Sequence, residues 1–185
     1  MAIVKPIALT VNAFDATIAQ TFYFTASGGN QIVKNKITIR NNETNTVVYT
    51  NTVESYSLSQ TVPANTLTNG LYYNYSFVTY DVNNNESAES NIVSFYCYTT
   101  PILTFTNIPS NKIISTGSYS FDIQYTQNEG ELIDYIYVVL YDSSENVISQ
   151  SDNIYSTSTP PFTINQMFSG LENNVSYYIK AYGVT

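Results

Sequence analysis

Apolar and polar residues alternate in short runs along the whole chain, and turns rich in Asn, Gly, Ser and Asp separate the runs. A period of two residues is typical of antiparallel strands with one buried face, and no stretch shows the 3.6-residue period of an amphipathic helix. The pattern predicts about seven strands in the first half, the number typical of an immunoglobulin-like sandwich. They fall at residues 7–11, 22–24, 37–39, 47–49, 56–58, 73–77 and 93–97.

The second half of the chain repeats this plan. Between the halves stands Thr99-Thr100-Pro101, and Pro101 suits a boundary because it lacks a backbone N–H and cannot join a strand ladder. The sequence therefore predicts two domains, residues 1–99 and 100–185, and the short linker predicts that they stack end to end with little freedom. The second set of strands is expected at residues 103–105, 119–125, 132–141, 147–149, 162–164 and 177–181.

One local spacing occurs in both halves. Leu67 precedes Tyr73 by six residues, and Leu171 precedes Tyr177 by six residues. A Leu and a Tyr at this spacing, at the start of an alternating strand, resemble the tyrosine corner of fibronectin type III sandwiches. In that motif the Tyr packs over the preceding loop, and its hydroxyl bonds a backbone group near the Leu.

Over nearly its whole length the chain thus resembles two tandem fibronectin type III-like domains. The resemblance implies an all-β fold of two antiparallel sandwiches. That family usually has a Trp on its second strand, and this chain has no Trp. Phe24 and Tyr125 stand in its place, which leaves another immunoglobulin-like variant open.

The second domain is expected to be incomplete at its C-terminal end. Eight residues follow Tyr177, whereas roughly 25 follow Tyr73 within the first domain, enough for a turn and a closing strand. A missing last strand would leave a long unpaired edge. We expect either further residues of a longer polypeptide or a neighbouring subunit to supply it, and we favour the longer polypeptide.

Composition narrows the functions that the chain could have. The net charge is −8, and only six Lys and Arg are present, so nucleic acid and anionic membrane surfaces are disfavoured as partners. The chain has no His and one Cys, and therefore lacks the commonest general base and the commonest metal ligands. We predict a non-catalytic protein without metal or cofactor, in which Cys97 is a small buried side chain near a strand end.

Acidic and polar residues gather in two turns. Asp81-Val82-Asn83-Asn84-Asn85-Glu86 offers oxygen ligands at alternate positions, which could bind calcium, but it lacks the central Gly and the distant Glu of an EF-hand loop. A hairpin turn is the better interpretation. Residues 142–146 are expected to form a second solvated turn.

Eighteen tyrosines are more than a core requires. Alternation places some of them outward in two groups, and Tyr is enriched at protein interfaces. We favour protein contact; a platform for sugars is disfavoured by the absence of Trp, and plain surface is the remaining alternative. The two groups are Tyr72, Tyr73 and Tyr75, and Tyr135, Tyr137 and Tyr141.

The role of the chain is inferred from a resemblance and from its first residues. Residues 63–101, PANTLTNGLYYNYSFVTYDVNNNESAESNIVSFYCYTTP, resemble N-terminal regions of tail-associated minor structural proteins of phages of low-GC Gram-positive bacteria. The first residues do not form a secretory signal, because Thr10 and Asn12 interrupt the apolar run.

The resemblance implies a structural protein of a tailed-phage virion that assembles in the host cytoplasm. It would serve in the tail or baseplate as an anchor or spacer for a larger fibre or host-binding protein. Its partners would be other virion structural proteins, and it would form a symmetric homo-oligomer. The alternative is an extracellular bacterial adhesin or an accessory spacer module of a carbohydrate-active enzyme.

Overall fold

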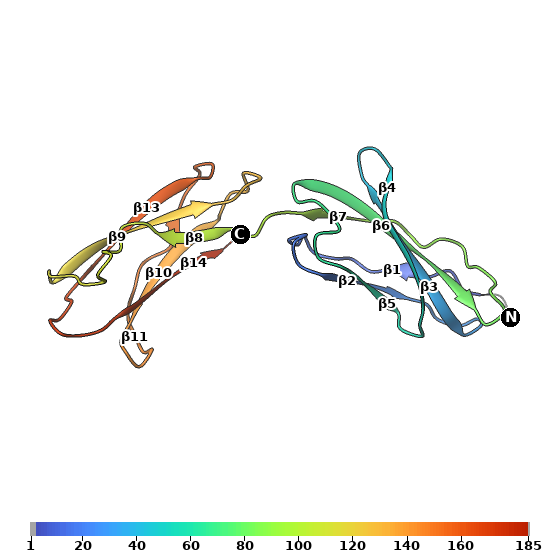
Figure 1. Ribbon diagram of the computed structural model, residues 1–185, viewed down its shortest axis with the longest axis horizontal. Coiled ribbons are helices and arrows are strands. Elements are labelled where there is room, and N and C mark those ends of the chain that lie inside the picture. The colour runs from blue at the N-terminus through green and yellow to red at the C-terminus, as the bar shows by residue number, and fades with distance from the viewer. Residues whose placement is uncertain (1–2, 185) are drawn as a thin grey trace. The chain divides into compact units, whose positions relative to one another are not determined.

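The computed structural model describes residues 3–184, and in that range it consists of strands, turns and loops without a helix (Figure 1). Within the same range, no helix that could cross a membrane is present. The chain divides into two compact units, Met1–Thr100 and Pro101–Thr185, which we call unit 1 and unit 2.

Unit 1 is a sandwich of two antiparallel sheets. A three-stranded sheet has the order β1-β2-β5, and a four-stranded sheet has the order β4-β3-β6-β7. Figure 1 shows β3 and β6 as the long central strands of the second sheet. The strands are β1 Ile7–Ala8, β2 Gln20–Thr25, β3 Ile32–Asn41, β4 Val47–Glu54, β5 Ser59–Val62, β6 Leu71–Asp81 and β7 Val93–Cys97.

Unit 2 has a similar topology with two differences, which concern the counterparts of β4 and β7. Its first sheet has the order β8-β9-β13, and in its second sheet β10 pairs with β11 and β12 and, along its whole length, with β14. Among residues 101–184, no strand takes the position that β7 has in unit 1. The strands are β8 Ile102–Phe105, β9 Ser118–Thr126, β10 Tyr135–Tyr141, β11 Val147–Gln150, β12 Ile154–Tyr155, β13 Phe162–Ser169 and β14 Tyr178–Val184.

This strand order confirms the predicted fold class. Each unit is an antiparallel β-sandwich that resembles fibronectin type III-like domains, and the second unit lacks the last strand within the described residues. A hairpin turn at residues 41–45 joins β3 to β4, and Asn45 in it adopts a positive φ of 56°.

Aromatic rings fill the core of unit 1 in the alternating pattern that the sequence predicts. Phe22 packs edge-on against Tyr75 with ring centroids 4.7 Å apart, and Phe24 packs against Phe77 at 4.5 Å. Phe24, which stands where the family usually has a Trp, is 1 % exposed. All buried apolar side chains of this unit belong to one continuous cluster.

The core of unit 2 is smaller and is divided into two clusters. One is centred on Phe121 and Leu140, and the other on Tyr125 and Ile136. Tyr125 stands in the second Trp position, is fully buried, and donates its hydroxyl proton to the Glu131 carbonyl at 2.9 Å. The same ring therefore fills the core and closes a loop.

Two predicted strands of unit 1 differ from the structure. The strand predicted at residues 7–11 is only Ile7–Ala8, in which Ala8 is buried and Ile7 is 58 % exposed. The pattern predicted a strand at residues 56–58, but Tyr56 is 71 % exposed and the strand is Ser59–Val62. Its inward position is taken by a polar residue, Gln60, whose amide group donates to the backbone carbonyl and the side chain of Asn35 at 3.0 and 2.8 Å. A buried polar pair of this kind interrupts the apolar alternation on which the prediction depends.

Candidate functional site

The four predicted corner residues lie at the entries to β6 and β14. The Tyr73 hydroxyl accepts a hydrogen bond from the Thr68 N–H at 3.0 Å and donates to the Thr68 carbonyl at 3.2 Å. The Tyr177 hydroxyl accepts from the Glu172 N–H at 2.9 Å. The bonded residues directly follow Leu67 and Leu171. Leu67 and Tyr73 are buried, whereas Leu171 and Tyr177 are only partly buried against their core.

In each unit the corner tyrosine links its strand to the preceding loop. Its hydroxyl accepts a hydrogen bond from the N–H of the residue that follows the corner leucine. In unit 2, Leu171 and Tyr177 also line a groove of about 370 Å³. That these four residues determine the fold stays a prediction.

The outer face of the β10–β14 sheet carries a continuous cluster of tyrosines. The rings of Tyr137 and Tyr182 stack with centroids 5.0 Å apart and an interplanar angle of 13°. Tyr135 lies between Tyr137 and Tyr155, at 6.4 and 5.7 Å. The hydroxyls of Tyr141 and Tyr182 form a hydrogen bond of 3.0 Å. We call these five residues the tyrosine face.

Strand pairing assembles the tyrosine face from distant parts of the sequence. Tyr135, Tyr137 and Tyr141 lie on one face of β10, with Val139 between the last two, and the sequence predicted that some of these tyrosines point outward. Tyr182 is opposite Tyr137 on β14, and Tyr155 is opposite Tyr135 on β12. The sequence alone does not place these last two tyrosines on the face, because their register is set by long-range pairing.

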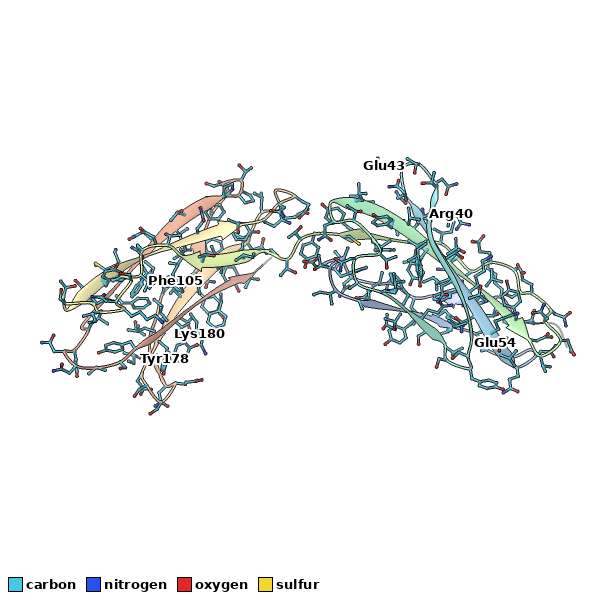
Figure 2. The ribbon with its side chains drawn as sticks, viewed as in Figure 1. Arg40, Glu43, Glu54, Phe105, Tyr178 and Lys180 are labelled. Carbon is cyan, nitrogen blue, oxygen red and sulfur yellow. The ribbon has the colours of Figure 1, made fainter. Side chains whose placement is uncertain are left out.

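Tyr141 has two polar neighbours on the tyrosine face. The hydrogen bond with Tyr182, together with partial burial, raises the pKa of Tyr141 to about 12. The ammonium group of Lys180 lies over the Tyr141 ring, 5.1 Å from its centroid. Figure 2 shows Lys180 on β14, beside Tyr178. The Tyr141 hydroxyl therefore stays protonated at neutral pH.

The tyrosines of β6 in unit 1 are divided between the two faces of the strand. Tyr73 and Tyr75 point into the core, and burial raises the pKa of Tyr75 to about 12. Tyr72 points outward, is 56 % exposed, and stacks on Tyr96 of β7 with centroids 4.6 Å apart. On its corresponding face, unit 1 thus carries one stacked pair, whereas unit 2 carries five connected rings, of which Tyr155 is exposed and the other four are partly buried.

The segment considered for calcium forms a hairpin turn. Oδ1 of Asp81 accepts from the N–H groups of Asn83 and Asn85, both at 2.9 Å. Oδ2 accepts from the side-chain amides of Asn85 and Asn30. The hydrogen bonds from Asn85 and then Asn30 lower the pKa of Asp81 to about 2. Both carboxylate oxygens of Asp81 thus already accept hydrogen bonds that order the turn.

The turn at residues 142–146 uses the same device. Asp142 accepts from the N–H groups of Ser144 and Asn146 and from the Asn146 side chain, and these bonds lower its pKa. In residues 3–184 no three His, Cys, Asp or Glu side chains are grouped as a metal site.

Cys97 is a small buried side chain at the end of β7, which confirms that prediction. Burial, and secondarily the negative charge of Asp15, raise the pKa of its thiol to about 12. The thiol therefore stays protonated at neutral pH and is a poor nucleophile.

The carboxylate of Asp15, which the sequence did not single out, links three segments of unit 1. Oδ2 of Asp15 accepts from the backbone N–H and hydroxyl of Thr100 at 2.7 and 2.8 Å. Oδ1 accepts from Thr17 and from the Asn69 side chain. Burial by itself would raise the pKa of Asp15, but these hydrogen bonds outweigh it and hold the pKa well below its usual value. Only the Asp15–Thr17 turn has a local signal in the sequence.

Comparison with known proteins adds little to this description. No protein-family model and no curated protein matches the chain. The chicken interferon gamma receptor alpha chain is similar with a TM-score of 0.44 and 13 % identity, over 98 % of this chain and 90 % of that one. The BSP domain of a biofilm associated protein has a TM-score of 0.31 and 16 % identity, over 96 % of this chain and 26 % of that one. At these scores neither likeness bears on function, and the fold rests on the topology above.

Proposed function

We propose that the chain is a non-catalytic structural module of a tailed-phage virion, associated with the tail or baseplate, which anchors or spaces a larger fibre or host-binding protein. The observation that supports a structural role is the tyrosine face, a rigid group of rings on the outside of a sheet. The assignment to a phage rests on the resemblance of residues 63–101 alone.

The geometry of the tyrosine face suits protein contact. Tyrosine gives a large contact area at a small cost in conformational entropy, because its side chain has two rotatable bonds. Here that cost is already reduced, since stacking of Tyr137 on Tyr182 and the Tyr141–Tyr182 hydrogen bond order the rings. The partners would be other virion proteins, or further copies of this chain arranged with rotational symmetry.

Carbohydrate binding, which would fit the alternative of an adhesin or an enzyme accessory module, is less well supported. A sugar platform needs a ring face open to solvent. The faces of Tyr137 and Tyr182 lie against each other at 13°, and Lys180 covers Tyr141. Tyr155, which is 71 % exposed, offers the largest open area of the five.

The location of the native protein tests this proposal. Particles purified from the natural host and analysed by quantitative mass spectrometry should contain the chain in a fixed ratio to other tail proteins. Recovery from the cell wall or the medium, with none in particles, would refute the virion role and favour the adhesin.

A variant pair tests the tyrosine face itself. Replacing Tyr155 and Tyr182 by Ser should reduce incorporation into particles, because the contact surface loses two rings. The matched control replaces Tyr72 and Tyr96 of unit 1 by Ser and should leave incorporation unchanged. Equal incorporation of both variants would show that the tyrosine face is plain surface.

A further inference from the structure

Asn69 and Gly70 form the only asparagine-glycine pair in the sequence, and they lie in the loop between β5 and β6. In such a pair the backbone nitrogen of the glycine can attack the side-chain carbonyl carbon of the asparagine, because glycine has no side chain to hinder the approach. Every other asparagine of the chain is followed by a residue with a side chain. The pair is therefore the place in this chain where an asparagine loses ammonia most readily.

The folded structure engages every group that this reaction needs. Oδ1 of Asn69 accepts a hydrogen bond from the Ala16 N–H at 2.8 Å, and Nδ2 donates to Oδ1 of Asp15 at 2.9 Å. The Gly70 N–H, which carries the attacking nitrogen, donates to the Cys97 carbonyl at 2.7 Å. The side-chain amide and the nucleophile are thus bonded to different partners. Folding therefore suppresses the reaction.

This protection depends on loops rather than on the core. Asn69 is only partly buried, and Gly70 is exposed. The carboxylate that holds the Asn69 amide belongs to Asp15, which itself lies in the segment between β1 and β2. Loops with few buried contacts open more readily than core strands, and their opening does not require the whole unit to unfold. The Asn69 amide is therefore released in the open state of this loop.

We propose that Asn69 is a modification site, which loses ammonia when the loop before β6 opens, and that the product prevents the loop from closing again. The Gly70 nitrogen forms a bond with Cγ of Asn69, the Cγ–Nδ2 bond breaks, and Nδ2 leaves as ammonia with the proton of the Gly70 N–H. Water then opens the succinimide ring at one of its two carbonyl groups. The product at position 69 is aspartate or isoaspartate, and the reaction needs no oxidant, metal or enzyme.

Neither product restores the contacts of the closed loop. Aspartate places a carboxylate oxygen where Nδ2 stands now, 2.9 Å from Oδ1 of Asp15. Two carboxylates at that distance repel each other and cannot both stay ionised. Isoaspartate adds a methylene group to the main chain directly before Gly70, so the Gly70 N–H is displaced from the Cys97 carbonyl. The modified chain therefore keeps a permanent record of each opening that led to reaction.

The first experiment incubates the chain at neutral pH in buffer and in unfolding urea, and measures each asparagine by peptide mapping with mass spectrometry. In urea, Asn69 should convert faster than any other asparagine. In buffer its conversion should be at least about tenfold slower, because it requires the open state. Asn91 is the internal control: its side chain bonds the N–H and the carbonyl of Ala8 in a similar way, but Ile92 follows it. It should stay unmodified in both conditions.

Two variants test whether Asp15 protects the site. Asp15→Ala releases the Asn69 amide and should raise the rate of conversion in buffer about tenfold, the effect of losing a hydrogen bond to a charged group. NMR signals of β3 and β6 report whether unit 1 stays folded. Should this variant unfold, Thr100→Ala removes only the hydroxyl bond to Oδ2 of Asp15 and should raise the rate by a smaller factor.

Asn69→Asp tests the consequence of the modification. Its urea midpoint should lie below that of the parent chain at pH 7, and the difference should shrink toward pH 5, because a proton taken up by the two carboxyl groups restores one hydrogen bond. The Cys97 thiol, which also interacts with Asp15, stays protonated over this range. Asn69→Ser loses the same hydrogen bonds without adding charge, and its difference from the parent should not change between pH 7 and pH 5.

Three results would overturn the proposal. Equal conversion of Asn69 in buffer and in urea would show that the fold does not control the site. Conversion of another asparagine ahead of Asn69 in urea would show that the reactive pair lies elsewhere. A urea midpoint of Asn69→Asp equal to that of the parent at pH 7 would show that the loop closes over the product.

Discussion

The two units share one inward pattern and differ on their outer faces. Ile39 of β3 and Leu140 of β10 are equivalent, because they pair with the equivalent residues Tyr75 and Ile179. This equivalence aligns three outward positions of β3 with three outward positions of β10. They hold Lys34, Lys36 and Arg40 in unit 1, and Tyr135, Tyr137 and Tyr141 in unit 2.

The outward side chains of the two units make different contacts. Arg40 of β3 forms an ion pair with Glu89 at 3.4 Å, and Lys34 lies over the ring of Tyr80. Such exposed contacts contribute little to stability and keep a surface solvated. The tyrosines of unit 2 instead cluster and shield one another. The inward side chains thus define the fold, whereas the outward side chains can vary and define the surface with which each unit contacts a partner.

The largest effect on stability is expected for Phe95 of β7, a strand that has no counterpart among the described residues of unit 2. Phe95→Ala removes a ring that packs on Phe14, Phe22 and Tyr73. It should lower the free energy of unfolding of unit 1 by about 3–5 kcal/mol, the usual cost of deleting a buried ring. Urea unfolding followed by hydrogen exchange separates the two units. Ser94→Ala, on the exposed face of β7, is the control and should change stability by less than about 0.5 kcal/mol.

The next effect concerns Asp15, which has no counterpart among the perturbed carboxyl groups of unit 2. Asp15→Asn should cost unit 1 about 2 kcal/mol, because an amide cannot accept all the hydrogen bonds from Thr17, Asn69 and Thr100. Asp152→Asn, an exposed position in unit 2, should be neutral. Equal stability of the two variants in urea would contradict this role.

The same carboxylate makes the stability of unit 1 depend on pH. The pKa of Asp15 is lower in the folded state than its ordinary value of 3.8. Its contribution is therefore complete above the unfolded pKa and is lost as the pH falls below about 4 toward the folded pKa. In Asp15→Asn this part of the acid destabilisation should disappear, which urea midpoints measured from pH 7 to pH 2 would show.

A smaller effect distinguishes the two corners. Tyr73→Phe should cost unit 1 about 1–2 kcal/mol, because a buried hydroxyl loses two hydrogen bonds with Thr68. Tyr177→Phe should cost unit 2 about 0.5–1 kcal/mol, because its hydroxyl makes one bond at a partly exposed site. Tyr72→Phe is the control. If Tyr177→Phe were the costlier change, the corner of unit 2 would have to be closed by a strand that covers it.

The smallest effect on stability, and the most specific, is expected on the tyrosine face. Tyr182→Phe removes the hydrogen bond that is the main cause of the raised pKa of Tyr141, so that pKa should fall from about 12 toward 10. Stability should change by less than about 0.5 kcal/mol. The pKa of Tyr75, which burial raises to about 12, should stay where it is. NMR titration of ring signals distinguishes the two tyrosines, and an unchanged Tyr141 would contradict the pairing of the hydroxyls.

Much of the fold could be predicted because it depends on local pattern. Alternation of apolar residues located β6 and β9, and the Leu-to-Tyr spacing located both corners. The prediction failed at residues 56–58, because Gln60 takes an inward position and is satisfied by Asn35, a partner 25 residues away. A polar core residue cannot be recognised without its partner.

The two sandwiches, the inward aromatic cores and an outward direction for some of Tyr135, Tyr137 and Tyr141 could be predicted from the sequence. These follow from a side-chain period of two, which each strand carries within a few residues. Only the tertiary structure decided the rest. The places of Tyr155 and Tyr182 on the tyrosine face depend on strand register, which is set by pairing between segments far apart in the chain. A one-residue shift would turn both side chains to the opposite face. The contacts of Asp15 with Asn69 and Thr100 depend on loops that only the folded chain brings together.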